Sequence, residues 1–171
     1  AEVSHVEGSN TTVNVSGFWK TSEGAAIASS SGHTLRFEAQ NTKGVAVGGS
    51  SVLLQNTMKG ASTLTLAGTI SADGGLTAGS RTDIDINSVK EDGYAVDAAV
   101  YGAVSGAEGR SESSIDRTSK VNVAKDAQLS SGGELALSAY TDEDNTLRVR
   151  GRTAGAAAGV TAYNHNTETI K

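Results

Sequence analysis

Carboxylates are the side chains of this sequence that could most directly do chemistry. The acidic triplet Asp142–Asp144 is followed by Asn145, and Asp83 and Asp85 alternate along another segment. Clustered carboxylates can bind Ca²⁺ through about six to eight oxygen atoms. The glycine-rich nonapeptide that builds calcium-binding β-rolls does not occur here. The pattern therefore favours solvated turns over a metal site.

Acid–base catalysis needs at least two groups that converge and have shifted pKa values. The one grouping that could serve a polysaccharide lyase or a glycosidase is Asp83 and Asp85 with Arg81 and Lys90. We expect the basic side chains to neutralise the carboxylates instead. The three histidines, His5, His33 and His165, are far apart in the sequence, and no cysteine is present. We predict no catalytic residue, no metal and no cofactor, and therefore a protein that is not an enzyme.

Two further sites could contact a glycan. Arg148, Arg150 and Arg152 recur at every second position, so a strand would present them as one row, about 6.8 Å apart. Guanidinium groups in such a row could bind sulfated or carboxylated sugars, although ion pairs with carboxylates of neighbouring coils are the favoured alternative. Trp19, next to Phe18, could stack on a sugar ring, but covering the open end of the fold is favoured.

Composition bounds the class of protein. The 171 residues include 21 glycines and no proline, and only 4% of them are aromatic. Aromatic side chains supply much of the buried area in a compact core, so a narrow core repeated along an axis suits this chain better. A formal net charge of −5 argues against a general nucleic-acid binder, which would show a concentrated basic face.

Apolar and polar residues alternate in short bursts, which is the pattern of β-strands. In each burst the outer two residues are predicted to point inward, and Val123 and Leu137 are among them. The segment Tyr94–Ser105 fits both periods, and its glycines favour a strand over a helix. The bursts are Val13–Val15, Leu35–Phe37, Val45–Val47, Leu64–Leu66, Ile84–Ile86, Val121–Val123, Leu135–Leu137 and Leu147–Val149.

Internal repeats predict how these strands are arranged. Val121–Tyr140 resembles Leu64–Gly79, and Ala103–Ile115 resembles Ala157–Ile170. Successive bursts are often separated by about 20 residues, which is typical of a parallel β-solenoid with coils of that length. About eight coils, stacked ~4.8 Å apart, would form a rod about 40 Å long. The segment Ser16–Ser30 has no partner repeat and is predicted to be an insertion or a cap.

The phrases Val121–Ala139 and Thr153–Ile170 resemble repeats of the large filamentous adhesins and leukotoxin-type surface proteins, which are similar to filamentous haemagglutinin. The resemblance covers about two thirds of the chain. It implies a right-handed, single-stranded parallel β-helix, secretion by a type V route and an adhesive role. The segment Ser16–Ser30 departs from the pattern, and no family site residues can be transferred.

We therefore expect residues 1–171 to be one β-solenoid segment of a longer, exported protein. The expected function is that of a structural or adhesive rod at the bacterial cell surface, in a parent anchored at or secreted across the outer membrane. Its expected partner is a glycan or protein on a host or neighbouring cell, not a nucleic acid, and the segment is expected to be monomeric. The alternative is a carbohydrate-active β-helix enzyme or a glycan-binding module.

Overall fold

The computed structural model describes residues 1–171 as an all-β chain with 81% of its residues in strands and no helix. There is accordingly no helix that is long and apolar enough to cross a membrane. The strands are β1 (Glu2–Val15), β2 (Phe18–Thr21), β3 (Ala25–Phe37), β4 (Ala39–Gly44), β5 (Val47–Leu66), β6 (Thr69–Ala72), β7 (Leu76–Ser88), β8 (Tyr94–Tyr101), β9 (Val104–Val123), β10 (Gln128–Ser131), β11 (Leu135–Asn145), β12 (Arg148–Ala154) and β13 (Ala157–Ile170).

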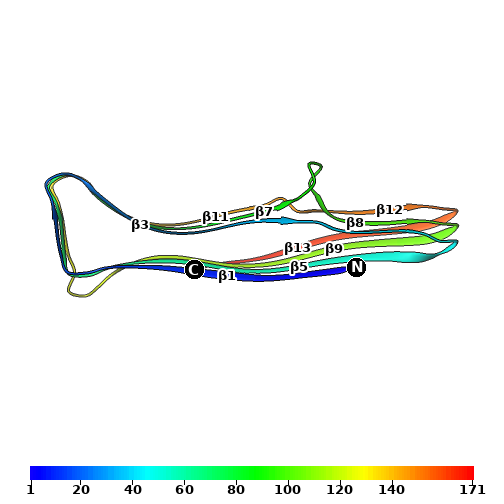
Figure 1. Cartoon of the computed structure of the whole chain (residues 1–171), viewed down its shortest axis with the longest axis horizontal. Coiled ribbons are helices and arrows are strands. Elements are labelled where there is room, and N and C mark those ends of the chain that lie inside the picture. Colours follow the sequence, from blue (N-terminus) through cyan, green and yellow to red (C-terminus); the bar gives the residue numbers. More distant parts are fainter.

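Strands that occupy the same place in successive coils pair in parallel. The four sheets have the orders β1-β5-β9-β13, β2-β6-β10, β3-β7-β11 and β4-β8-β12. In Figure 1 the four-stranded sheet forms one long layer, and the β3 and β4 groups together form the facing layer. The β2 group closes one end, and tight turns close the other. The predicted parallel β-solenoid is thereby confirmed.

The coil is much longer than predicted from the sequence. Glu2 pairs with Leu53, Val47 with Val104, and Val104 with Ala157, so one coil is more than twice the expected length. The chain completes three coils and begins a fourth with β13. Three coils rise only about 14 Å, whereas β5 alone extends about 65 Å across a coil. The expected rod of eight coils is therefore wrong.

The recurring step of about 20 residues between bursts has a different origin from the one expected. It is roughly the distance along the chain from a strand to the strand that faces it across the same coil. Ser80, for example, donates a hydrogen bond to Ser62 Oγ across the interior at 2.9 Å. Facing strands run in opposite directions, so the distance along the chain between facing residues changes along the coil: it is 9 for Ser50 and Asn41 and 24 for Ser9 and His33. Residues one whole coil apart are neighbours through stacking.

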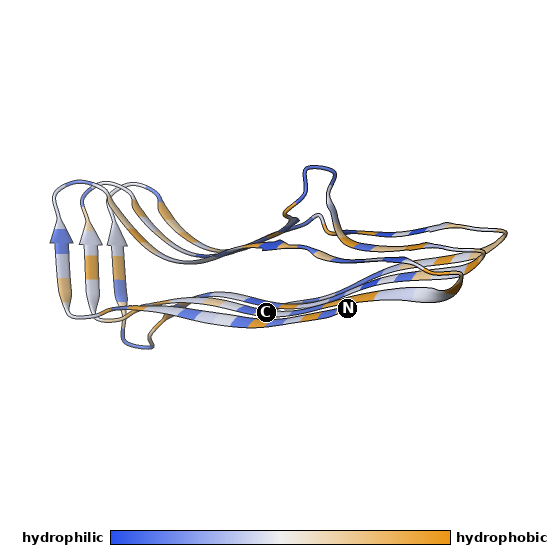
Figure 2. Ribbon diagram, turned by 45° about the vertical axis from the view of Figure 1, so that its right-hand side comes forward, coloured by the Kyte–Doolittle hydropathy of each residue, from blue (hydrophilic) through white to orange (hydrophobic).

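Hydrophobic and hydrophilic residues alternate along the strands (Figure 2), and this alternation places apolar side chains inside the flattened coil. The second coil is the best buried because coils cover it on both sides. Val52, Leu54, Leu64 and Leu66 of β5 are all completely inaccessible to solvent. The apolar interior forms two separate clusters, one beside the β6 turn and a larger one toward β8.

A polar band separates the two apolar clusters. Ser29 and Ser80 both hydrogen-bond to Ser62 at 2.9 Å, and Ser119 donates to Thr82 at 3.0 Å. These hydrogen bonds offset the free-energy cost of burying the hydroxyl groups of the band. This band was not predicted from the alternation, which assumed an apolar interior throughout.

Some predicted positions differ in the structure. Val45 and Val47 lie at the corner between β4 and β5 and are 38% and 71% exposed, so they do not point into the core. Val123 and Leu137 occupy the same register positions as the buried Leu66 and Ala78, as expected. They are nevertheless 45% and 46% exposed, because no strand covers them on the outer side.

Two predictions about the repeats are resolved by the strand register. Leu64–Gly79 and Val121–Ser138 stack on each other in consecutive coils, as their similarity indicated. Ser16–Ser30 is not an insertion: it forms β2 and the first part of β3, which pair with β6 and β7 without interruption. The segment Tyr94–Tyr101 is a strand, and this choice over a helix is confirmed.

Candidate functional site

The three arginines of the predicted row on β12 have two different environments in the structure. Arg150 and Arg152 of β12 both bind Asp97 of β8, with Nη2–Oδ2 distances of 2.7 and 2.6 Å. Arg150 also lies 4.4 Å from the centre of the Tyr94 ring. Burial acts to raise the pKa of Asp97, but the two guanidinium groups outweigh it and hold that pKa below its ordinary value. For these two arginines the structure shows the expected ion pairs between neighbouring coils.

Arg148 differs from the other two members of the row. It forms no ion pair and no side-chain hydrogen bond. Its side chain crosses Gly93, where φ is +77° and an added Cβ would lie 3.4 Å from Arg148 Cδ. Arg148 is therefore the one arginine of the row that remains available to a ligand.

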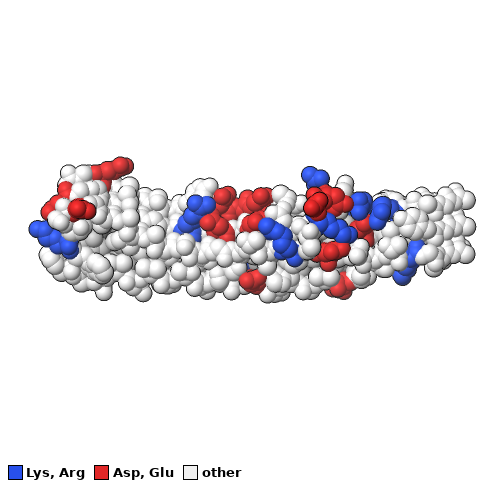
Figure 3. All heavy atoms as spheres, turned by 45° about the horizontal axis from the view of Figure 1, so that its top comes forward, with Lys and Arg blue, Asp and Glu red and all other residues white.

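Stacking brings the predicted acidic residues together. Asp83 pairs in register with Asp142, and Asp85 with Asp144, so four carboxylates form two short ladders. Figure 3 shows a group of carboxylates flanked by basic side chains on this face. The paired residues are separated by a whole coil, a spacing that the shorter coil expected from the sequence could not reveal.

Basic side chains pair with Asp83, Asp85 and Asp142 of these carboxylates. Arg81 Nε lies 2.7 Å from both carboxylate oxygens of Asp83, and its Nη2 lies 3.8 Å from Asp142. Arg36 Nη2 lies 3.1 Å from Asp85. Lys90, the fourth member of the nominated catalytic grouping, pairs instead with Glu38 at 3.1 Å. The nominated grouping is therefore split between a strand face and a loop.

Two histidines that are distant in sequence converge inside the first coil. His5 Nε2 and His33 Nδ1 each lie 3.1 Å from a different carboxylate oxygen of Glu7, and Ser9 hydrogen-bonds to His33 Nε2 at 2.6 Å. No group of three His, Asp or Glu side chains has a geometry that could hold a metal ion. His165 lies elsewhere, stacked on Tyr163 with 6.1 Å between ring centroids.

Trp19 lies on β2, in register with the buried Ile70 of β6. Its indole N–H donates to Ser16 O at 3.0 Å, and the residue is 57% exposed. A hollow of about 240 Å³ beside it is lined by Ala25, Ile27 and Ile70, among others. Trp19 therefore lies beside the smaller apolar cluster and is largely exposed.

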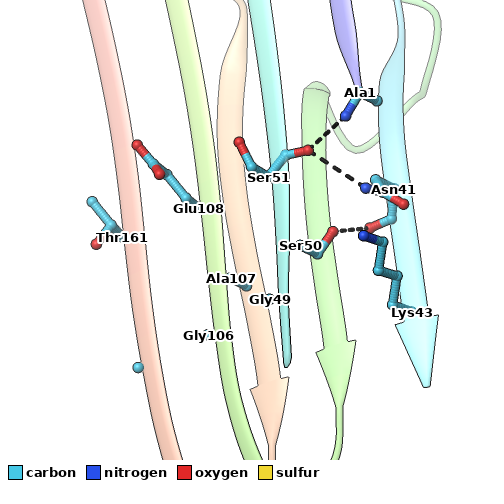
Figure 4. A pocket seen from close by; sticks show the side chains of 11 residues that line it. Ala1, Asn41, Lys43, Gly49, Ser50, Ser51, Gly106, Ala107, Glu108 and Thr161 are labelled. Carbon is cyan, nitrogen blue, oxygen red and sulfur yellow. Dashed lines mark hydrogen bonds between the residues drawn. The ribbon is translucent and has the colours of Figure 1, made fainter. Parts of the chain in front are cut away.

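A hollow of about 500 Å³ lies where β5 and β9 continue past the first residue of the chain (Figure 4). The in-register glycines Gly49, Gly106 and Gly159 form part of its lining. The Ala1 amino group donates to Ser51 O at 2.8 Å within it.

No protein-family model, curated protein or solved structure matches this chain. The chemistry of its surface must therefore be inferred from the arrangement itself. Most charged side chains on the outer face form ion pairs between adjacent coils or between alternate residues of one strand. Arg148 is the one arginine outside that pattern, since every other arginine forms an ion pair with a carboxylate.

Proposed function

We propose that this chain is a structural segment of an exported bacterial surface adhesin. Its role is to hold binding surfaces at a fixed distance and orientation. The resemblance of Val121–Ala139 and Thr153–Ile170 to filamentous adhesin repeats supports the proposal, as does the solenoid architecture.

The main support for the proposal is the parallel register of the four-stranded sheet, which is unbroken between successive coils. β5, with 20 residues, pairs with β9 along its whole length, and β1 and β13 extend the same sheet on either side. Of 108 backbone hydrogen bonds, 86 lie within strand ladders. A repeat array of this kind derives its stability from contacts between neighbouring coils, so it remains extended without a large globular core. These properties suit a spacer that carries binding groups on its outer face.

Two measurements test the proposal. An antibody raised against the purified chain should label intact bacteria that carry the parent protein without permeabilisation of the cells. Beads coated with the chain should also attach to host or neighbouring cells. Beads coated with a Leu66→Asp variant provide the control for folding, because Leu66 is fully buried.

Labelling that requires permeabilised cells would refute the surface location. Attachment that is the same for the folded chain and for the Leu66→Asp variant would show nonspecific adsorption, and it would remove the adhesive part of the proposal. Treatment of the target cells with periodate or with protease then separates a glycan partner from a protein partner.

A further inference from the structure

A loop between β7 and β8 interrupts the otherwise smooth outer surface. Phe37 pairs with Ser88 before the loop, whereas Ala39, only two positions later, pairs with Val96 after it. The second coil therefore contains additional residues at this point. Residues 88–93 project from the coil as the protrusion seen in Figures 1 and 2. A local insertion of this kind on a regular scaffold is a common position for a binding group.

The loop is fixed to the coils on both sides of it. Lys90 Nζ lies 3.1 Å from Glu38 and 3.2 Å from Gln40 Oε1, both in the first coil. Asp92 accepts a hydrogen bond from Tyr94 N at 3.1 Å and lies 3.4 Å from Arg150 of the third coil. The loop is therefore ordered before any ligand arrives, which lowers the entropic penalty of binding.

A hollow of about 340 Å³ lies beside the loop and is lined by all three coils. Arg36 comes from the first coil, Lys90 from the second and Arg148 from the third. Asn87, Ser88 and Thr146 add an amide and two hydroxyl groups to the lining. Glu91 and Asp92 also line the hollow, so its three basic side chains exceed its acidic ones by one, a balance suited to a single oxyanion.

The charge balance singles out one residue of this hollow. Arg36 is engaged by Asp85, Lys90 by Glu38, and Asp92 by Arg150. Arg148 has no carboxylate partner, and its guanidinium fork can bind two oxygens of one group. Glu91, on the same loop, also has no ion pair, and its charge opposes an anionic ligand.

We propose that this hollow binds a sulfate or carboxylate group of an anionic glycan, with Arg148 as its principal contact. The inference rests on the proposed adhesive role for its biological setting only, and it names a ligand class for that role. Nonspecific binding of a polyanion is disfavoured because the chain carries a net charge of −5, so binding depends on a local site.

The experiment measures binding of the purified chain to dextran sulfate, carboxymethyl-dextran and unmodified dextran of equal length, at physiological ionic strength. We expect the parent to bind at least one charged polymer and not the neutral one. Arg148→Gln should weaken binding at least about tenfold, because one charge-assisted, bidentate contact is lost. Glu91→Gln should strengthen it by about two- to threefold, since a repulsive charge is removed.

Lys125→Gln is the matched control, because Lys125 is an exposed lysine on the turn before β10 and forms no ion pair. It removes one positive charge away from the hollow, and it should change the affinity by less than about twofold. Arg148→Gln should melt within about 1 °C of the parent, because an unpaired surface charge contributes little to stability, so a loss of binding is not a loss of folding.

Equal weakening by Arg148→Gln and Lys125→Gln would show nonspecific attraction and overturn the inference. Failure of the parent to bind either charged polymer would overturn it as well. Neither result decides the proposed function, which the labelling and bead-attachment measurements test separately. A preference for dextran sulfate or for carboxymethyl-dextran identifies which oxyanion the hollow accepts.

Discussion

Asp97 is the charged residue whose removal should most clearly affect the stability of the solenoid. It lies on β8 between Arg150 and Arg152 of the next coil and is only 3% exposed. Hydrogen bonds between charged groups each contribute about 1.5–3 kcal/mol when one partner is buried. In Asp97→Asn one oxygen becomes an amide that cannot accept from a guanidinium, although both arginines can partly regain solvent.

We therefore expect Asp97→Asn to lower the free energy of unfolding by about 3 kcal/mol at pH 7. For a chain of this length the loss corresponds to a fall in Tm of about 6–12 °C. Asp85→Asn is the matched control, because Asp85 is a half-exposed aspartate with an ion pair to Arg36. An exposed pair contributes at most about 1 kcal/mol, so this variant should melt within about 4 °C of the parent.

The pH dependence gives a second test of the same residue. The pKa of Asp97 in the folded chain lies below the ordinary value of 3.8, so its contribution is fully present above that value. It is lost as the pH falls further, through the folded pKa. The difference in Tm between the parent and Asp97→Asn should be constant from pH 7 to about 5 and should shrink below about 4. An Asp97→Asn variant that melts with the parent at pH 7, or an Asp85→Asn control that melts as low as Asp97→Asn, would refute this reasoning.

Four further predictions concern the interior, the corners and metal binding. Leu66→Asp should destabilise the chain by about 4 kcal/mol in denaturant unfolding, and Val123→Asp, 45% exposed in the same register column, by less than half as much. Burial raises the pKa of Glu143 above its ordinary value of 4.5, so the parent should gain stability as the pH falls from 7 toward about 5. In thermal melts Glu143→Gln should show no such gain, and at pH 7 it should be at least as stable as the parent. An equal loss of stability relative to the parent at pH 7 and at pH 5 would contradict this. Gly102→Ala should lower the free energy of unfolding by more than about 2 kcal/mol, because the added Cβ would lie 1.8 Å from a backbone carbonyl oxygen. Gly159→Ala should change the free energy of unfolding by less than about 0.5 kcal/mol, because open space surrounds Gly159. Thermal melts in millimolar Ca²⁺ and in chelator should coincide within about 2 °C, since basic side chains already pair with the acidic ladders; a larger shift, or stoichiometric metal in elemental analysis, would show a site.

The strands themselves could be predicted because alternation is a local property. In Leu64–Leu66 and Ile84–Ile86 the outer residues point inward whatever the rest of the chain does, since a strand has a period of two. The similarity of Leu64–Gly79 to Val121–Tyr140 also indicated stacked coils, and the register confirms it. The same local rule failed at Val45 and Val47, because a corner breaks the alternation.

The order of the residues was enough to predict a β-structured, repetitive chain built as a parallel solenoid. The length of the coil followed only from the three-dimensional arrangement, because alternation within a strand does not indicate which distant strand stacks on it. Coil length determines the pairs made by stacking, such as Asp97 with Arg150 and Asp83 with Asp142. The position of the turn within a coil determines the pairs made across the core, such as His33 with Glu7. It also leaves Arg148 without a partner beside the loop. No pattern in neighbouring residues identifies partners that are so distant along the chain. Their interactions can be recognised only from the stacked coils.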